Sequence, residues 1–242
     1  MKNSIKLLVI CSLLLTSMTY AQWSSIQIIK GNGKVTSVNK STDPYNAIAI
    51  EGFFDVELVS GKVGNITIKG EENLLPYIKV EVVGQVLKIS RKKYKYIFNG
   101  QKIILVVPIE SINQVSLTGS GHVITKNSIK SKSFSGKLIG SGDMNLEIES
   151  NDVSLNLSGS GNIRLTGTTE KLNSNLYGSG DIQAANLKAK NVKANVSGSG
   201  DTSVYCSESI YARVSGSGNV EYRGNPKQED TRVNGSGGIS KA

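Results

Sequence analysis

Acidic residues recur at one position of this sequence in a way that could bind calcium. Asp143, Asp181 and Asp201 each follow a Gly-Ser-Gly triplet, and the single histidine, His122, follows another. Stacked carboxylates could supply the oxygen ligands that Ca²⁺ prefers. However, each copy supplies one carboxylate, and asparagine interrupts the series. Short Asp and Asn side chains hydrogen-bond nearby backbone in turns, so we expect turn caps here and no metal or other cofactor.

Catalytic groups are sparse. One histidine cannot form a histidine-based metal site, and no Ser or Cys lies near His122 at the spacing of a nucleophile. We therefore expect His122 to be a solvent-facing corner residue. Arg164 and Arg213 could bind an acidic polysaccharide in a lyase, but neither lies near an acidic cluster at matching spacing. The sequence favours a protein that is not an enzyme, with a polysaccharide-active enzyme as the weakest alternative.

One short segment, RKKYKY, alternates basic and aromatic side chains and is the candidate ligand-binding site. Such interleaving can bind an anionic glycan or a nucleic acid. The plainer interpretation is a hairpin tip whose aromatic rings cover a neighbouring sheet. The candidate residues are Arg91, Lys92, Lys93, Tyr94, Lys95 and Tyr96.

The N-terminus has the features of an export signal. Lys2 and Lys6 precede an apolar stretch of about a dozen residues, too short to span a membrane, and cleavage is expected after Ala21. Cys11 lacks the small residues that precede a lipid-attachment site, so lipidation is disfavoured. The net charge of +9 falls to +7 without the two lysines, which favours anionic partners such as acidic glycans or phosphorylated lipid surfaces. Export argues against nucleic acid as the partner, and no transmembrane segment is expected in the mature chain.

A Gly-Ser-Gly triplet would position the candidate residues, because it occurs seven times at spacings of 18 to 21 residues. Apolar residues alternate on both sides of it with period two, which is typical of half-buried strands. Both glycines share the inward phase, so we expect them where the chain bends or where opposing walls come close. These structural glycines are Gly119, Gly121, Gly140, Gly142, Gly159, Gly161, Gly178, Gly180, Gly198, Gly200, Gly216, Gly218, Gly235 and Gly237.

The repeat predicts an all-β fold, namely a parallel β-helix or β-solenoid of stacked repeats of about 19 residues. A β-sandwich or β-prism of short strands is the alternative. After the signal peptide at residues 1–21, residues 22–45 are a lead-in or cap, and residues 46–112 form a β region with longer strands. Residues 113–242 form the Gly-Ser-Gly region, continuous with it. Cys206, the one cysteine after the signal, has inward phase and should be a buried, inert thiol.

A degenerate copy of the repeat lies in AIAIEGFFDVEL, where Phe54 occupies the place of the second glycine and suggests a wider turn. This segment, the motif G-S-G-[DN]-[IV], NLLPYIKVEVVGQVLKI and the signal peptide together resemble the family called putative auto-transporter adhesin, head GIN domain, common in Bacteroidetes. The resemblance covers about residues 46–240. It implies an extracytoplasmic, all-β protein, and it brings no catalytic or binding residues.

The function expected from the sequence is that of an exported, non-enzymatic adhesin or binding module for a glycan or another envelope component. The protein would be periplasmic, associated with the outer membrane, or secreted. A regular ladder of outward serines, such as Ser158, Ser197 and Ser215, would give a flat polar face. The alternative function is assembly into a homo-oligomer through an uncovered terminal β edge without a polar cap.

Overall fold

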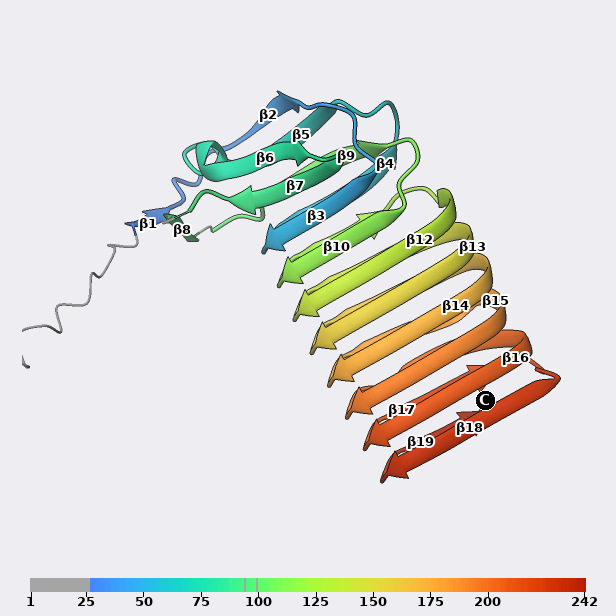
Figure 1. The fold of residues 1–242 in the computed structure, drawn as a ribbon. Helices are drawn as coiled ribbons and strands as arrows, with labels where there is room; N and C mark the ends of the chain where they lie inside the picture. Colours follow the sequence, from blue (N-terminus) through green and yellow to red (C-terminus); the bar gives the residue numbers. More distant parts are fainter. Residues whose placement is uncertain (1–26, 94, 99) are drawn as a thin grey trace, which may run out of the picture.

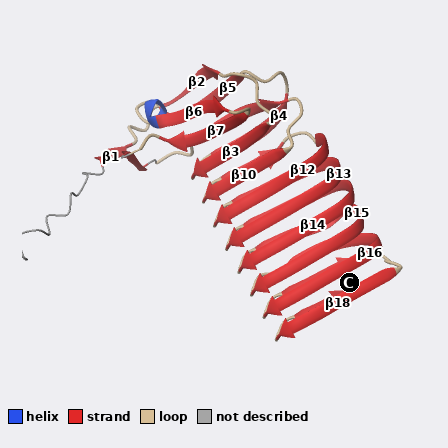
Figure 2. Cartoon of the chain, viewed as in Figure 1, coloured by secondary structure: helices blue, strands red, loops and turns tan. Residues whose placement is uncertain are grey.

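A computed structural model describes residues 27–93, 95–98 and 100–242. The expected signal peptide therefore lies outside the described residues. Nearly all of the described chain is strand, with one 3-10 helix, η2 (Leu75–Tyr77) (Figures 1 and 2). The strands are β1 (Gln27–Lys30), β2 (Val35–Ser41), β3 (Ala47–Gly52), β4 (Asp55–Ser60), β5 (Asn65–Glu71), β6 (Ile78–Val83), β7 (Val86–Arg91), β8 (Lys95–Phe98), β9 (Ile104–Ile109), β10 (Gln114–Gly119), β11 (His122–Thr125), β12 (Ile129–Gly140), β13 (Asp143–Gly159), β14 (Asn162–Gly178), β15 (Asp181–Gly198), β16 (Thr202–Gly216), β17 (Asn219–Arg223), β18 (Gln228–Gly235) and β19 (Gly238–Lys241).

The strands stack as a parallel β-solenoid of about seven turns, which confirms the expected fold and rules out the sandwich and the prism. Each full turn consists of two walls joined by two corners. Wall A contains β4, β9, β11, the first halves of β13–β16, β17 and β19. Wall B contains β3, β7, β10, β12, the second halves of β13–β16, and β18. Equivalent residues of successive turns pair directly, as Gly140 does with Gly159 and Gly159 with Gly178.

The Gly-Ser-Gly triplets form one corner, the glycine corner, where each chain passes from wall B to wall A. The first glycine has a positive φ, for example +129° at Gly159, which side chains rarely adopt. A Cβ there would meet the carbonyl oxygen of Gly140, one turn earlier, and a Cβ at Gly161 would meet that of Gly142. The glycines lie where the chain bends, as expected, and close stacking along the axis requires them as well. At Gly161 an added Cβ would also come within 3.0 Å of the Leu138 side chain on wall B.

The opposite corner, the far corner, has no Gly-Ser-Gly triplet, although Gly224 stacks on Cys206 there. Ser150, Thr169 and Cys206 occupy matching inward positions there, and their side chains donate to carbonyl oxygens of the bend. Thr169 Oγ1 donates to Lys171 O at 3.0 Å, and Cys206 Sγ donates to Ser209 O at 2.9 Å. Cys206 is fully buried, and burial raises the pKa of its thiol, so it is an unreactive corner residue as expected.

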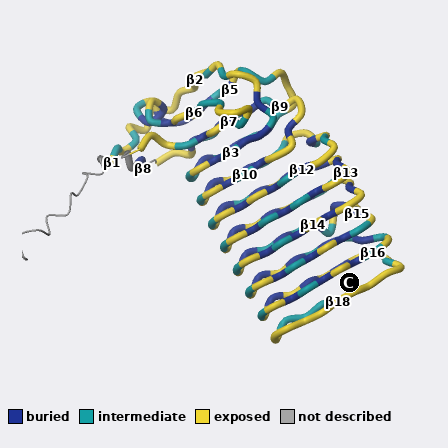
Figure 3. The backbone as a smooth tube through the Cα atoms, in the orientation of Figure 1, coloured by how far each residue is buried: buried dark blue, intermediate teal, exposed yellow. Residues whose placement is uncertain are grey.

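A column of apolar side chains fills the space between the walls (Figure 3). Leu155, Leu157, Ile163 and Leu165 are fully buried in the middle turns. Burying each such side chain contributes roughly 1.5–3 kcal/mol. This column, together with the backbone ladders, stabilises a chain that has no disulfide among its described residues.

The degenerate copy stacks in register with the repeats. Residues 47–52 pair with β10, and Asp55 pairs with His122, so fully buried Phe54 stands level with Gly121. Beyond this turn, toward the N-terminal end of the stack, the direction of the strands changes. Strands β5, β6 and β2 run antiparallel to the strands with which they pair. These strands close the N-terminal end of the stack.

Glu71 fixes two loops at that end. Glu71 is only 2% exposed. Its carboxylate accepts hydrogen bonds from the backbone N–H groups of Gly33 at 2.7 Å and Gly100 at 3.0 Å. These hydrogen bonds lower the pKa of the carboxyl below its usual value, and the bond from Gly33 contributes most. The charged form of Glu71 is therefore part of the folded state.

Glu71 should make the stability of the protein fall in acid. Because the folded-state pKa is depressed, the stabilisation is complete above the unfolded value of about 4.5 and is lost as pH falls through the folded value. Glu71→Gln removes the charge at every pH, so the variant should be less stable at neutral pH and lose less on acidification. Urea midpoints measured across the acid range test this. Parallel pH profiles for the two proteins would contradict it.

The last turn is more polar than expected. Inward positions of β18 carry Glu229 and Thr231 beside Val233, and the Glu229 carboxylate accepts from Tyr222 Oη at 3.0 Å. Among the described strands β18 pairs only with β16 and β19 only with β17, so the edge itself is uncovered, as expected. In the part of the chain that is described, no helix has the length and apolar character needed to cross a bilayer.

Candidate functional site

The acidic ladder lies at the start of wall A, where its carboxylates accept from the backbone of the next solenoid turn and not from nearby backbone of their own bend as expected. Asp181 Oδ1 accepts from the backbone N–H of Asp201 at 3.0 Å, and Asp201 Oδ1 accepts from that of Asn219 at 2.8 Å. His122 lies half exposed between Asp55 and Asp143, 3.1 Å from each carboxylate. The described residues contain no group of three or more metal-ligating side chains.

The two candidate arginines do not converge. Arg164 lies on wall A and donates to Gln183 Oε1 at 2.7 Å. Arg213 lies on wall B and is held by both carboxylate oxygens of Asp230, at 2.9 and 2.8 Å. Because the core separates the two walls, these residues cannot act on one substrate.

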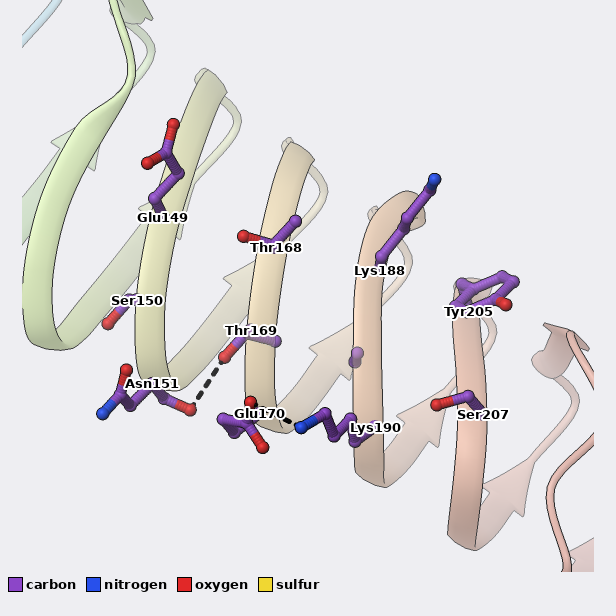
Figure 4. A pocket seen from close by; sticks show the side chains of 11 residues that line it. Glu149, Ser150, Asn151, Thr168, Thr169, Glu170, Lys188, Lys190, Tyr205 and Ser207 are labelled. Atoms are coloured by element: carbon purple, nitrogen blue, oxygen red, sulfur yellow. Dashed lines mark hydrogen bonds and ion pairs between the residues drawn. The ribbon is translucent and has the colours of Figure 1, made fainter.

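A groove of about 520 Å³ crosses β13–β16 at the far corner (Figure 4). Its outward residues form rows across the turns, one of which runs Glu149, Thr168, Lys188, Tyr205. Acids and bases stand together here, so the groove is the first place to look for catalytic chemistry.

The carboxylates of this groove are already paired. Glu170 lies 2.8 Å from Lys190, and Glu149 lies 3.1 Å from Lys130 in the turn before. The hydrogen bond from Lys190 to Glu170 raises the pKa of the lysine and keeps it protonated. With each carboxylate matched to a lysine, the groove holds no acid–base pair poised for catalysis.

Wall B carries two further hollows, of about 430 and 510 Å³. The first contains Lys171 and Lys193, and the second contains Tyr177 and Arg232. Between them runs a ladder of amides, in which Asn175 donates to Asn156 at 3.1 Å and Asn195 donates to Asn175 at 2.9 Å.

Tyr211 connects the basic residues of wall B. The guanidinium of Arg213 lies 3.6 Å from the centre of its ring, and Lys193 Nζ lies 5.4 Å from it. The bond from Arg213 lowers the pKa of the Asp230 carboxyl and keeps it charged, so Arg213 is neutralised by Asp230. Lys193 lacks such a partner among the ion pairs of the described residues.

The expected serine face is not uniform. Ser158, Ser197 and Ser215 do lie in one row of wall B, but Tyr177 stands between Ser158 and Ser197 and is 55% exposed. An exposed ring in a polar row gives a ligand an apolar surface as well as hydroxyl groups.

The outer faces of the two walls differ in charge. Wall B in the repeat region carries the bases Lys137, Lys171, Lys193, Arg213 and Arg232 against the acids Asp152 and Asp230. Wall A, with the turns leading into it, carries the acids Asp143, Glu147, Glu149, Asp181, Asp201 and Glu221 against the bases Lys126, Lys130, Arg164, Lys188 and Arg223, so its charges nearly balance. An anionic ligand is therefore attracted to wall B more strongly than to wall A.

The predicted basic-aromatic segment lies at the N-terminal end, away from wall B of the repeats. Arg91 ends β7, and Lys92 and Lys93 follow it as exposed residues. Lys95 and Tyr96 belong to β8, whose backbone pairs with β1, and Tyr94 lies outside the described residues. Sequence reasoning named Arg213 and the serines of wall B but missed Lys171, Lys193 and Arg232. The rows of wall B join residues 18 to 20 positions apart, which become neighbours only when the turns stack.

A family model described as "Putative auto-transporter adhesin, head GIN domain" matches residues 44–226. The chain belongs to this family. The resemblance inferred from the Gly-Ser-Gly motifs is thereby confirmed. No curated protein matches the sequence.

Solved structures share the fold of this family member. A putative adhesin from Bacteroides fragilis superposes with a TM-score of 0.84 at 24% identity, covering 88% of this chain and all of that one. A putative lipid binding protein from Parabacteroides distasonis gives 0.75 at 26% identity, covering 89% and 100%. A putative adhesin from Parabacteroides merdae gives 0.71 at 23% identity, covering 89% and 99%.

Proposed function

We propose that this protein is an exported, non-enzymatic binding protein that holds an anionic glycan of the cell envelope against wall B. The observation that carries the proposal is the difference in charge between the walls. A basic, hollowed wall that also carries tyrosines and amides stands opposite a wall whose acids and bases nearly balance.

The side chains of wall B suit a glycan. Lysine and arginine attract carboxylate or sulfate groups, and asparagine both donates to and accepts from sugar hydroxyls. Tyr177 and Tyr211 offer amphipathic rings against which a sugar can pack. Since successive turns are about 4.8 Å apart, these groups recur along the axis and suit an extended chain rather than a compact ligand.

A non-enzymatic role agrees with the chemistry of the described surface. Arg164 and Arg213 lie on opposite walls, and the carboxylates of the far-corner groove are paired with lysines. Membership of an adhesin family supports both binding and export. A role like the one named for the Parabacteroides distasonis protein would need space for acyl chains, whereas the interior between these walls is filled by buried aliphatic side chains.

Binding to acidic and neutral polysaccharides tests the proposal. Polygalacturonate and heparin are the acidic probes, and dextran is the neutral one. The triple variant Lys171→Gln, Lys193→Gln, Arg232→Gln should weaken binding to an acidic probe by about tenfold or more, since each lost cation removes a charge contact. Tyr177→Ala should weaken it by a few fold.

The matched control is Lys126→Gln, Arg164→Gln, Arg223→Gln, which removes the same charge from wall A. It should leave binding within about twofold, because wall A does not touch the ligand. Equal loss in both triple variants would show attraction to net charge alone and would refute wall B as the site. Equal binding of dextran and the acidic probes would refute an anionic ligand.

A further inference from the structure

Wall A changes in length within the repeat region, and the far-corner groove lies at that change. Residues 163–169 of β14 pair with residues 182–189 of β15, and these pair with residues 202–206 of β16. The wall therefore gains one residue at β15 and loses three at β16. Because the backbone ladders hold both ends of these segments in register, the surplus residues of β15 have to leave the regular path of the wall.

The surplus forms a bulge directly before Lys188. Three residues of β15 separate Ala184 from Lys188, whereas their partners in β16, Val204 and Tyr205, are consecutive. Leu187, within the bulge, stays fully buried, so the core is kept and the outer surface changes. A bulge bends its strand and redirects the side chains beside it. The irregularity thus lies where Lys188 enters the lining of the groove.

Uncharged polar side chains make up much of this lining (Figure 4). Thr168, Lys188 and Tyr205 are paired neighbours in three successive turns, so their backbones lie about 4.8 Å apart. Ser207 and Asn151 add a further hydroxyl group and an amide. The volume of about 520 Å³ is that of a site for a small ligand.

Lys188 is the charged side chain of the groove that remains available. Both lining carboxylates, Glu149 and Glu170, have lysine partners, and one of these partners is Lys190. The bond to Glu170 raises the pKa of Lys190 most, and the charge of Glu208, outside the lining, adds to this. Lys188 is exposed and has no ion-pair partner among the described residues. The groove thus presents one unpaired cation beside hydroxyl groups and an aromatic ring.

We propose that the far-corner groove binds a short saccharide that carries a single carboxylate, with the carboxylate against Lys188 and a sugar ring against Tyr205. The hydroxyl groups of Thr168 and Ser207 both donate and accept, as the hydroxyl groups of a sugar require. A simple anion would pair with Lys188 and leave the ring of Tyr205 uncovered. A polyanion would bring further carboxylates for which the groove has no unpaired cation.

This site is separate from the one on wall B. Lys188 and Lys193 belong to the same strand, β15, but they lie on either side of the far corner and line different hollows. The ligand of wall B is an extended chain that meets several cations, whereas the groove offers one. The two proposals rest on different residues, so either can fail without the other.

Calorimetric titration of the purified protein with two small probes tests the proposal. The acidic probe is an aldobiouronic acid, in which one glucuronate is linked to one neutral sugar, and the neutral probe is its methyl ester. The ester should bind about fivefold more weakly, since it cannot form an ion pair. Lys188→Gln should weaken binding of the acid by about fivefold and leave that of the ester within about twofold. Tyr205→Ala should weaken binding of both probes by a few fold.

Lys193→Gln is the matched control, because it removes one lysine from the same strand but on wall B. It should bind both probes as the unchanged protein does, and unchanged melting temperatures establish that the variants are folded. Equal loss in Lys188→Gln and Lys193→Gln, undiminished binding by Tyr205→Ala, or no binding of the acid at millimolar concentration would each overturn the proposal. So would displacement of the acid by an equal concentration of acetate, because a bare carboxylate would then suffice.

Discussion

Gly178→Ala is expected to lower the free energy of unfolding by roughly 3–5 kcal/mol, one of the largest effects of any single substitution in this chain. Gly178 has a φ of +129°, and an added Cβ would meet the carbonyl oxygen of Gly159 in the turn before. The clash is with backbone, so no side chain can rotate away from it. Relief would require adjacent turns to separate, which would weaken the ladder on both sides of the corner.

Gly64→Ala is the matched control. Gly64 also has a large positive φ, +119°, but an added Cβ would lie at ordinary contact distance, 3.6 Å from the carbonyl oxygen of Thr42. It should cost about 1–3 kcal/mol, the cost of the backbone conformation alone. Urea midpoints followed by circular dichroism compare the two. Similar losses would mean that φ, and not the stacking distance, explains the glycine corner.

The glycine corner could be predicted because it is the same in every turn. The pairing of Gly140, Gly159, Gly178 and Gly198 keeps this corner in register although the repeats differ in length. Extra residues are absorbed elsewhere, at irregularities such as that between Ala184 and Lys188. A motif that tolerates no displacement leaves a regular signal in the sequence. The far corner has Ser150, Thr169, Ala189 or Cys206 at its inward position, so its residues vary and its signal is weaker.

The N-terminal end could not be predicted in the same way. Alternation of apolar residues gives the buried face of a strand but is identical for parallel and antiparallel neighbours. The sequence thus indicated strands in residues 65–91 without showing that β5 and β6 reverse direction. That reversal ends the stack, because no further described strand pairs with β2 or β6.

The outer faces depend on stacking even more strongly. Lys171 and Lys193 are separated in the sequence, and only the pairing of β14 with β15 brings their turns together. The signal that could have found wall B is the list of outward residues at one repeat spacing, but the spacing changes from 19 to 20 to 18 residues in this region. Each change in spacing shifts the rows of outward residues. The candidate site could therefore be recognised only once the pairing register of the strands was known.

Deletion of residues 160–178 is expected to leave a folded protein that is one turn shorter. The cut joins Gly159 to Ser179, so the glycine corner is rebuilt and β13 lies against β15 in the register that β14 had. Asn195 can then donate to Asn156. The new contact between Asp143 and Asp181 costs less than about 1 kcal/mol, because both carboxylates remain at the surface. The free energy of unfolding should fall by the contribution of one repeat and of one interface between neighbouring repeats.

Deletion of residues 160–169 is the control, because it removes half a turn. It would place residues of wall B where wall A must begin, remove Gly161 from the corner and direct apolar side chains outward, so no cooperative unfolding should remain. Circular dichroism and urea titration of both proteins distinguish the cases. If the full-turn deletion unfolds as completely as the half-turn deletion, the turns are not interchangeable layers, and stability must depend on contacts that reach beyond adjacent turns.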